Sequence, residues 1–241
     1  MCGICDAVGT TNLHSIAKNI AATQARIADA ARAVGREPDS VKLIAVSKRK
    51  PIEQIEQAYA AGLTNFGENY LQEAIPKIEA LSHLPITWHF IGAIQSNKTR
   101  AIAEHFHWVH TIDRSKIAKR LNDQCPSGKT LQACLQVNVD ADPSKAGVDS
   151  HHAAQTLKDI DELPAIQLRG LMTILRLDAD PLKGYNRLHD LFEELRGDTH
   201  EPWDTLSMGM SRDYPEAIAS GATHVRIGTD IFGARDQPEL K

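Results

Sequence analysis

The sequence alternates short apolar segments with longer amphipathic ones, and it does so eight times within 241 residues. Each short segment ends in polar residues or glycine, as a buried parallel strand does. The predicted strands are 41–48, 65–69, 87–92, 108–113, 131–138, 168–173, 205–211 and 225–228. Apolar residues recur at helical spacing in 52–61, 69–81, 96–105, 114–124, 150–161, 182–196 and 214–220. The alternation predicts an α/β protein with one domain, a single (β/α)8 TIM barrel.

An extra helix is predicted before the first strand, over residues 12–34. Gly35 follows it as a C-terminal cap, and its apolar face consists of Leu13, Ile16, Ile20, Ile27 and Ala31. We expect this helix to plug or flank the bottom of the barrel, within a domain that covers residues 12–241. Residues 1–11 are expected to form a frayed tail. The C-x-x-C of Cys2 and Cys5 is interpreted as part of that tail, because no strand precedes it and no second matching pair follows.

Composition and charge narrow the classes of function. The net charge is −4, and acidic and basic residues are interspersed, which argues against nucleic acid as the main partner. No apolar run is long enough to span a bilayer, and the first residues lack the features of a secretory signal. We therefore expect a cytoplasmic protein without membrane contact. His105, His107 and His110 lack an accompanying carboxylate motif, so no metal site is predicted.

Lys48 ends the first predicted strand, in the segment Val-Lys-Leu-Ile-Ala-Val-Ser-Lys. A lysine at the exit of a buried parallel strand lies at the rim of a closed core. Desolvation there disfavours the ammonium and makes the amine a nucleophile toward an aldehyde. Lys48 is therefore a candidate Schiff-base lysine. The alternative is that Lys48 begins a solvated Lys-Arg-Lys turn before Pro51.

Polar residues collect at the ends of the other predicted strands, where barrels of this kind have their sites. They are Glu68, Asn69, His89, Asp113, Asn138, Thr173, Ser211 and Arg226. A purely structural role is sufficient to explain Asp113, which can serve as a helix N-cap, and it is also sufficient to explain Glu68. It explains less well an arginine between apolar neighbours in Val-Arg-Ile-Gly. His89 is either a core histidine with satisfied hydrogen bonds or a residue that lines the barrel mouth.

The last two strands carry features of a phosphate site. Barrels often bind phosphate in the loops after strands seven and eight, through backbone N–H groups. The seventh segment provides the Ser211 hydroxyl, and the eighth provides Gly228 and Thr229, with glycine permitting close backbone approach. A phosphate site facing a Schiff-base lysine indicates an aldehyde that bears a phosphate. Pyridoxal 5′-phosphate (PLP) is the common cofactor with both groups.

Longer motifs surround these residues in a fixed order. They are Ala45-Val46-Ser47-Lys48, Phe66-Gly67-Glu68-Asn69-Tyr70, Trp88-His89-Phe90-Ile91-Gly92, Gln95-Ser96-Asn97-Lys98, His110-Thr111-Ile112-Asp113, Asn138-Val139, Gly170-Leu171-Met172, Ser207-Met208-Gly209-Met210-Ser211, Val225-Arg226-Ile227-Gly228-Thr229 and Ile231-Phe232-Gly233-Ala234-Arg235. From about residue 12 to residue 236 the chain resembles the pyridoxal phosphate homeostasis protein family. The resemblance implies a single barrel like the N-terminal domain of bacterial alanine racemase.

The resemblance also implies roles for individual residues. Lys48 would hold PLP as an internal aldimine, and Arg226 would face the pyridine nitrogen. A guanidinium there keeps that nitrogen unprotonated, which weakens the ring as an electron sink. The resemblance implies that the phosphate is held by Ser211, Gly228 and Thr229, with Ser207 and Met208 close by. It implies that Asn69 and Met172 line the cofactor pocket.

Two functions from different classes follow. The first is a carrier that binds PLP, keeps the aldehyde sequestered, passes it to apo-PLP enzymes and maintains PLP homeostasis and amino-acid balance, without catalytic residues of its own. The second is a PLP enzyme, a racemase or a decarboxylase. Racemases of this fold have a C-terminal β-domain with a second base, and none is expected here because the chain ends eight residues after Gly233. A Schiff-base aldolase on the same fold is a third alternative. The family resemblance implies a monomer.

Overall fold

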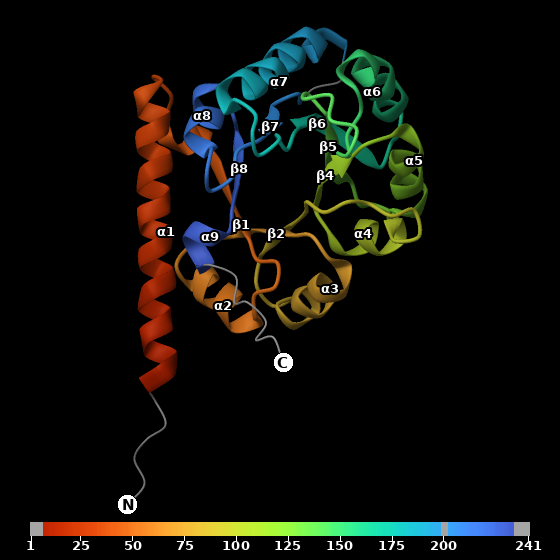
Figure 1. Ribbon diagram of the computed structural model, residues 1–241. Helices are drawn as coiled ribbons and strands as arrows, with labels where there is room; N and C mark the ends of the chain where they lie inside the picture. Colours follow the sequence, from red (N-terminus) through yellow and green to blue (C-terminus); the bar gives the residue numbers. More distant parts are fainter. Residues whose placement is uncertain (1–6, 199–201, 234–241) are drawn as a thin grey trace, which may run out of the picture.

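Eight parallel strands close into a barrel in the computed structural model, which describes residues 7–198 and 202–233. The strands pair in chain order, and the eighth pairs with the first (Figure 1). Their bounds are β1 Lys42–Val46, β2 Asn65–Glu68, β3 Thr87–Phe90, β4 Trp108–Ile112, β5 Leu131–Gln136, β6 Ile166–Met172, β7 Thr205–Ser207 and β8 His224–Ile227. The predicted (β/α)8 fold and the order of its strands are confirmed.

Helices surround the barrel and bury their apolar faces against the outer faces of the strands (Figure 1). They are α2 Ile52–Ala60, α3 Leu71–Ala80, α4 Thr99–His105, α5 Ser115–Gln124, α6 Ala153–Asp161, α7 Pro181–Leu195 and α8 Tyr214–Ala219, with short 3-10 turns at Pro38–Ser40, Ser150–His152 and Arg196–Asp198. A last short helix, α9 (Thr229–Phe232), follows β8 and was not predicted, because four residues are too few to show a helical period. None of the described helices is long and apolar enough to cross a membrane.

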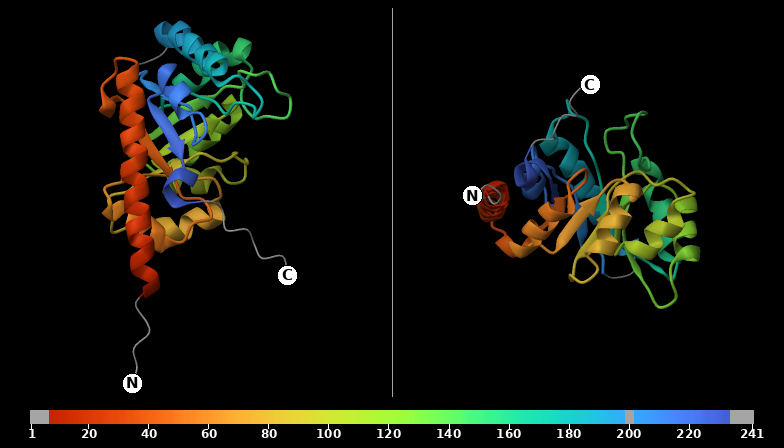
Figure 2. Two further views of the ribbon diagram at one scale, coloured as in Figure 1. Left: turned by 60° about the vertical axis from the view of Figure 1, so that its left-hand side comes forward. Right: turned by 90° about the horizontal axis from the view of Figure 1, so that it is seen from below.

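The N-terminal helix α1 (Ala7–Ala33) is longer than predicted, since it begins at Ala7 instead of residue 12. Its apolar face is as predicted over the part whose side chains are described, with Ile16, Ile20, Ile27 and Ala31 buried. The expectation that it plugs or flanks the barrel bottom is right only in part, because α1 reaches the 3-10 turn before β1 but does not plug the barrel. The helix runs along the outside of the helical ring, beside α2, α8 and α9 (Figure 2).

Polar contacts explain this position of α1. Asn19 Nδ2 donates a hydrogen bond to the carbonyl of Ile231 at 3.1 Å, and Arg26 forms an ion pair with Asp230. Both partners belong to α9, so the first and the last helix, α1 and α9, are held together by these contacts. Cys2 and Cys5 lie outside the described residues.

All eight strands end earlier than the sequence predicts, and the difference matters most for the candidate site at β1 and β7. β1 stops at Val46, so Lys48 lies in the following turn and not in the strand. β7 stops at Ser207 instead of Ser211, because Gly209 has a φ of +90° and turns the chain out of the sheet. A Cβ at Gly209 would lie 2.6 Å from the Cβ of Ala217, so only glycine fits this turn. Both early ends move the predicted site residues from strands into loops at the barrel mouth.

Candidate functional site at the barrel mouth

Lys48 lies half-buried in a tight turn that follows β1. The turn is closed by the N–H of Lys50, which donates to the carbonyl of Ser47 at 3.1 Å. Arg49 has a φ of +59°, and its N–H donates to Oε2 of Glu73 on α3 at 2.8 Å. Nζ of Lys50 donates to the carbonyl of Phe232 at 3.1 Å, which ties the turn to α9. The sequence left two interpretations of Lys48 open, a lysine at the exit of the strand and a lysine in a solvated turn. In the structure Lys48 lies in a turn just after the strand, and hydrogen bonds fix that turn.

A buried network supports this turn from behind. Nζ of Lys77, on α3, donates to the carbonyl of Ser47 at 2.9 Å and to Oε1 of Glu68 at 2.8 Å. The Ser47 hydroxyl donates to the same oxygen of Glu68 at 2.7 Å. Burial raises the pKa of Glu68, and the Lys77 ammonium opposes that rise. Glu68 is therefore part of a buried ion pair that fixes the residue next to Lys48.

The sequence did not single out Lys77. The only signal was its position, because it shares the buried face of α3 with Leu71 and Ala74, where an apolar residue is expected. A lysine at an apolar position of a helix indicates a buried partner, since an unpaired buried ammonium is very costly. Glu68 was interpreted as structural, and its contacts are with Lys77 and Ser47 on that side of the strand.

Asn69 follows β2 at the mouth and is half-buried. Its Oδ1 is buried without a hydrogen-bond partner in the described structure. A buried acceptor of this kind is costly unless a ligand or water supplies a donor. The next residue, Tyr70, is 42% exposed and stacks below the guanidinium of Arg49, at 5.7 Å from the ring centre. Asn69 thus has an acceptor available to a molecule bound at the mouth.

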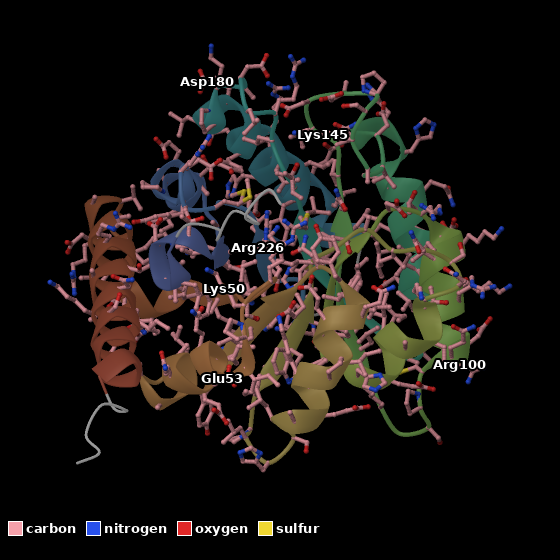
Figure 3. All side chains as sticks on the ribbon, turned by 60° about the horizontal axis from the view of Figure 1, so that its bottom comes forward. Lys50, Glu53, Arg100, Lys145, Asp180 and Arg226 are labelled. Atoms are coloured by element: carbon pink, nitrogen blue, oxygen red, sulfur yellow. The ribbon has the colours of Figure 1, made fainter. Side chains whose placement is uncertain are left out.

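Arg226, on β8, is buried inside the barrel with 4% exposure (Figure 3). Its Nη1 donates to the Ser207 hydroxyl at 2.7 Å, and its Nη2 donates to the carbonyl of Thr173 at 2.9 Å. Both acceptors are uncharged, and each Nη nitrogen carries a second N–H. Burial lowers the pKa of Arg226 from its ordinary value, but an arginine remains protonated in proteins. The barrel therefore holds a cationic, planar donor group in its interior.

The ends of β7 and β8 form one corner of the mouth. The N–H of Arg226 donates to the carbonyl of Gly209 at 3.0 Å, so the loop after β7 lies against β8. That loop carries Ser211, which is half-buried, and β8 leads into Gly228 and Thr229 at the start of α9. The first N–H groups of a helix have no acceptor within it, so they and the Ser211 hydroxyl can serve an anion.

Three of the predicted cofactor residues lie deeper than this corner. Met208 is fully buried in the hydrophobic core, so its side chain does not reach the mouth. Met172 is fully buried at the end of β6, in a small cluster with Trp108 and Cys134. The Ser207 hydroxyl is also buried, and its contacts are with Arg226 and with Nδ1 of His110. Whether these three residues touch a cofactor stays a prediction.

The interior below Arg226 holds a cluster of rings, which we call the interior cluster: His89, Trp108, His110 and His224. The ring centres of Trp108 and His224 lie 5.3 Å apart, although β4 and β8 are not neighbours in the sheet, so these rings meet across the barrel. Burial, and after it neighbouring positive groups, lower the pKa of all three histidines, and that of His224 falls to about 3. The histidines are therefore neutral at pH 7. Within the described residues, no three His, Cys, Asp or Glu side chains form a metal-binding group.

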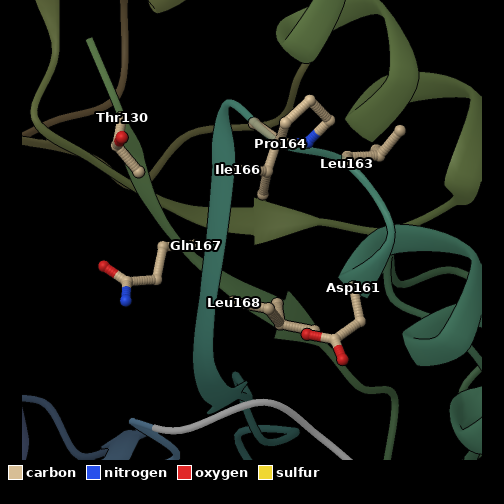
Figure 4. Close-up of a pocket in the computed structure, with 7 residues that line it drawn as sticks. All are labelled: Thr130, Asp161, Leu163, Pro164, Ile166, Gln167 and Leu168. Carbon is tan, nitrogen blue, oxygen red and sulfur yellow. The ribbon is translucent and has the colours of Figure 1, made fainter. Parts of the chain in front are cut away.

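A separate pocket lies at the opposite end of the barrel, where β5 and β6 begin (Figure 4). It is lined by Thr130, Asp161, Leu163, Pro164, Ile166, Gln167 and Leu168. No cation lies among these residues and none of the predicted site residues contributes to it. The candidate site is therefore the mouth around Lys48 and Arg226 and not this pocket.

Comparison with known proteins now identifies the family. The model of the alanine racemase N-terminal domain matches residues 12–236. The pyridoxal phosphate homeostasis protein of Pseudomonas aeruginosa is 52% identical over 228 residues, which cover 93% of this chain and 97% of that protein. The chain belongs to the pyridoxal phosphate homeostasis protein family.

Solved structures agree with this family assignment. The structure of PipY from Synechococcus elongatus with PLP bound has a TM-score of 0.80 and 39% identity, and the match covers 90% of this chain and 100% of that one. Alanine racemase from Corynebacterium glutamicum shares the fold, with a TM-score of 0.65 and 18% identity over 95% of this chain and 63% of the racemase. The family resemblance inferred from the motifs is confirmed.

Proposed function

We propose that this protein binds PLP at the barrel mouth and holds it as a Schiff base on Lys48, in the service of PLP homeostasis. The observation that carries the proposal is the arrangement of Lys48 and Arg226. Lys48 lies at the mouth on a turn that is fixed by buried hydrogen bonds, and Arg226 presents a cation from inside the barrel. A PLP-bound relative of the same fold supports the identity of the ligand.

The residues present fit the groups of PLP. Ser211, Gly228 and Thr229 at the corner of β7 and β8 suit the phosphate, since hydroxyl and backbone N–H groups bind anions. The guanidinium of Arg226 suits an unprotonated ring nitrogen because it can only donate. The buried Oδ1 of Asn69 has no partner in the described structure and can accept from a donor on the ligand.

Attachment to Lys48 is a condensation of an amine with an aldehyde. The Lys48 amine would hold the aldehyde carbon of PLP through a carbon–nitrogen double bond, with one water released. Water would reverse this condensation and release the aldehyde, and another amine would take the aldehyde over by imine exchange, which frees the Lys48 amine. A single lysine at the mouth is sufficient for this exchange, which is what a carrier requires.

Carriage is favoured over amino-acid turnover by two observations. First, the relative with 52% identity is a homeostasis protein by name. Second, Arg226 donates hydrogen bonds and cannot protonate a pyridine nitrogen, so a ring facing it is a weaker sink for carbanion electrons. The alternative of a racemase or decarboxylase rests on the fold shared with alanine racemase. For that alternative Tyr70, half-exposed at the rim, is the candidate second base.

The test of the proposal is reduction of the bound cofactor with borohydride. The purified protein is incubated with PLP, its absorbance spectrum is recorded, and borohydride is added before peptide mapping. We expect a pyridoxyl group on Lys48 and loss of the imine absorbance in Lys48→Ala. Lys50→Ala is the matched control, because Nζ of Lys50 donates to the carbonyl of Phe232. A label on Lys50 or Lys98 in the unmutated protein would refute the assignment.

A second experiment separates carrier from enzyme. The PLP-loaded protein is incubated with each L-amino acid while chiral inversion and carbon dioxide release are followed. It is then mixed with an apo-PLP enzyme whose recovered activity reports transfer. We expect transfer without sustained turnover. Turnover of one amino acid at roughly 1 per second, typical of slow enzymes, that is abolished by Tyr70→Phe would establish the racemase or decarboxylase alternative.

A further inference from the structure

A continuous chain of hydrogen bonds runs through the barrel interior to Arg226. The Ser207 hydroxyl lies 2.7 Å from Nη1 of Arg226 and 2.8 Å from Nδ1 of His110. Nε2 of His110 lies 2.9 Å from Nδ1 of His89, and Nε2 of His89 lies 3.1 Å from Oδ1 of Asn65. The five residues come from β8, β7, β4, β3 and β2. Three of them, His89, His110 and Ser207, are fully buried.

The chemistry of the two ends fixes the direction of every bond. Oδ1 of Asn65 can only accept, and its amide nitrogen donates to Thr64 at 3.2 Å, so Nε2 of His89 carries the hydrogen. A neutral imidazole has one N–H, so Nδ1 of His89 accepts from Nε2 of His110. Nδ1 of His110 must then accept from the Ser207 hydroxyl. At the other end a guanidinium can only donate, so the Ser207 oxygen accepts from Arg226.

The result is a chain in which all bonds point from Arg226 to Asn65. It requires both histidines to be neutral with the hydrogen on Nε2, and burial keeps them neutral by lowering the pKa of each. The Ser207 hydroxyl could otherwise rotate freely. Because it donates to His110, its lone pairs are directed to Arg226, and with Thr173 it holds both Nη nitrogens of the guanidinium.

We propose that His110 and His89 are positioning residues of the cofactor site. Through Ser207 they orient the Arg226 guanidinium so that it donates a hydrogen bond to an aromatic ring nitrogen in the mouth. The inference rests on the proposed binding of PLP and assigns two interior histidines to the recognition of its ring. His224 belongs to the same interior cluster but not to the chain, since its Nδ1 contacts Thr223 at 3.0 Å and its Nε2 is a buried atom without a partner.

The contrast between His110 and His224 allows a matched experiment. Dissociation constants are measured for PLP and for 1-deazapyridoxal phosphate, in which a C–H replaces the ring nitrogen. We expect the unmutated protein to bind PLP about 10-fold more tightly than 1-deazapyridoxal phosphate, because one hydrogen bond to a charged group is worth about that much. In His110→Phe the ratio should fall toward 1, while in His224→Phe it should be kept. The ratio reports orientation, because loss of stability alone would weaken both ligands equally.

His110→Asn tests rescue within the same site. The asparagine amide can offer an acceptor to Ser207 but cannot span to His89, so we expect it to restore part of the ratio that His110→Phe loses. An unchanged ratio in His110→Phe, or an equal loss in His224→Phe, would overturn the inference. Equal binding of the two ligands by the unmutated protein would also overturn it while leaving PLP binding intact. Failure to bind PLP at all would refute the proposed function instead.

An independent measurement needs neither ligand nor variant. Long-range ¹H–¹⁵N spectra of the unloaded protein distinguish the two tautomers of a neutral histidine. We expect His89 and His110 both to carry the hydrogen on Nε2. A hydrogen on Nδ1 of His110 would break the chain at Ser207 and contradict the proposal.

Discussion

The mouth of the barrel and its interior cluster use polar side chains in different ways. At the mouth, polar atoms are left available: the buried Oδ1 of Asn69 has no partner, and Ser211 lies half-buried in the loop after β7. In the interior, His89 and His110 are bonded to each other and to their neighbours within 3.1 Å. Nε2 of His224 is the exception among the interior histidines.

This difference teaches where to look for a ligand. Burial makes an unpaired polar atom costly, so such an atom at a mouth indicates a partner that the chain itself does not supply. Paired interior atoms already meet their requirement and serve to hold other groups in place. Replacing residues at the mouth should therefore weaken ligand binding more than it lowers the stability of the fold. Replacing interior or supporting residues should lower the stability more than it weakens ligand binding.

The largest effect on the free energy of unfolding is expected when the two lysines around Ser47, Lys77 and Lys48, are replaced and compared. Lys77→Met removes one partner of a buried ion pair and leaves the Glu68 carboxylate uncompensated, which should lower the free energy of unfolding by about 3–5 kcal/mol. Lys48→Met should abolish borohydride labelling but change the free energy of unfolding by less than about 1 kcal/mol. Urea denaturation at pH 7 measures both. Equal losses of stability in the two variants would contradict the conclusion that Lys77 supports the fold while Lys48 at the mouth serves the ligand.

The pH dependence of Lys77→Met sharpens this prediction. The pKa of Glu68 is already raised by burial, and loss of the Lys77 ammonium should raise it further. A carboxyl whose pKa is raised on folding contributes stability below its unfolded pKa, and that contribution is lost as the pH rises through its folded pKa. The deficit of Lys77→Met should therefore shrink as the pH falls toward about 4. Adding Glu68→Gln should remove most of the deficit at pH 7.

A smaller effect is expected at the phosphate corner. Ser211→Ala should weaken PLP binding by roughly 1–3 kcal/mol, because it removes one hydrogen bond to a charged group. Ser220→Ala is the control in the neighbouring helix end, since the Ser220 hydroxyl is buried without a partner and lies outside the proposed site. Dissociation constants of PLP measure the effect. Pyridoxal without its phosphate should bind much less well, and equal affinity for the two compounds would contradict the placement of the phosphate.

The smallest effect concerns the titration of the interior histidines. Burial lowers their pKa on folding, so the stability they contribute is present above the unfolded value near 6.5 and is lost as the pH falls below it. For His224 the window runs from about 6.5 down to about 3. Each buried neutral histidine should contribute a slope of about 1.4 kcal/mol per pH unit. His224→Phe should reduce the slope by that amount in urea titrations between pH 6.5 and 5, and an unchanged slope would show that His224 is protonated in the fold.

Much of the fold could be predicted from the sequence, and so could several residues of the candidate site. Lys48, Asn69, Ser211 and Arg226 were recognised because each follows or interrupts an apolar strand segment, and a parallel barrel brings all its strand ends to one face. The carboxyl ends of all eight strands were predicted too late, that of β7 by the most, since a turn such as that at Gly209 depends on packing against Ala217 as well as on glycine. The position of α1 along the side of the helical ring was not predicted, because its partners, Ile231 and Asp230, lie more than 200 residues away in the sequence.

The sequence by itself determined the eightfold alternation, the face on which polar strand ends collect, and the family. These depend on local periodicity, on the one-way order of a parallel barrel and on contiguous motifs. Only the tertiary structure decided that Lys77 supports the Lys48 turn and that Ser207 contacts His110, 97 residues away. The inward side chains of different strands meet only once the barrel has closed in one register, and no local pattern encodes which of them then face each other.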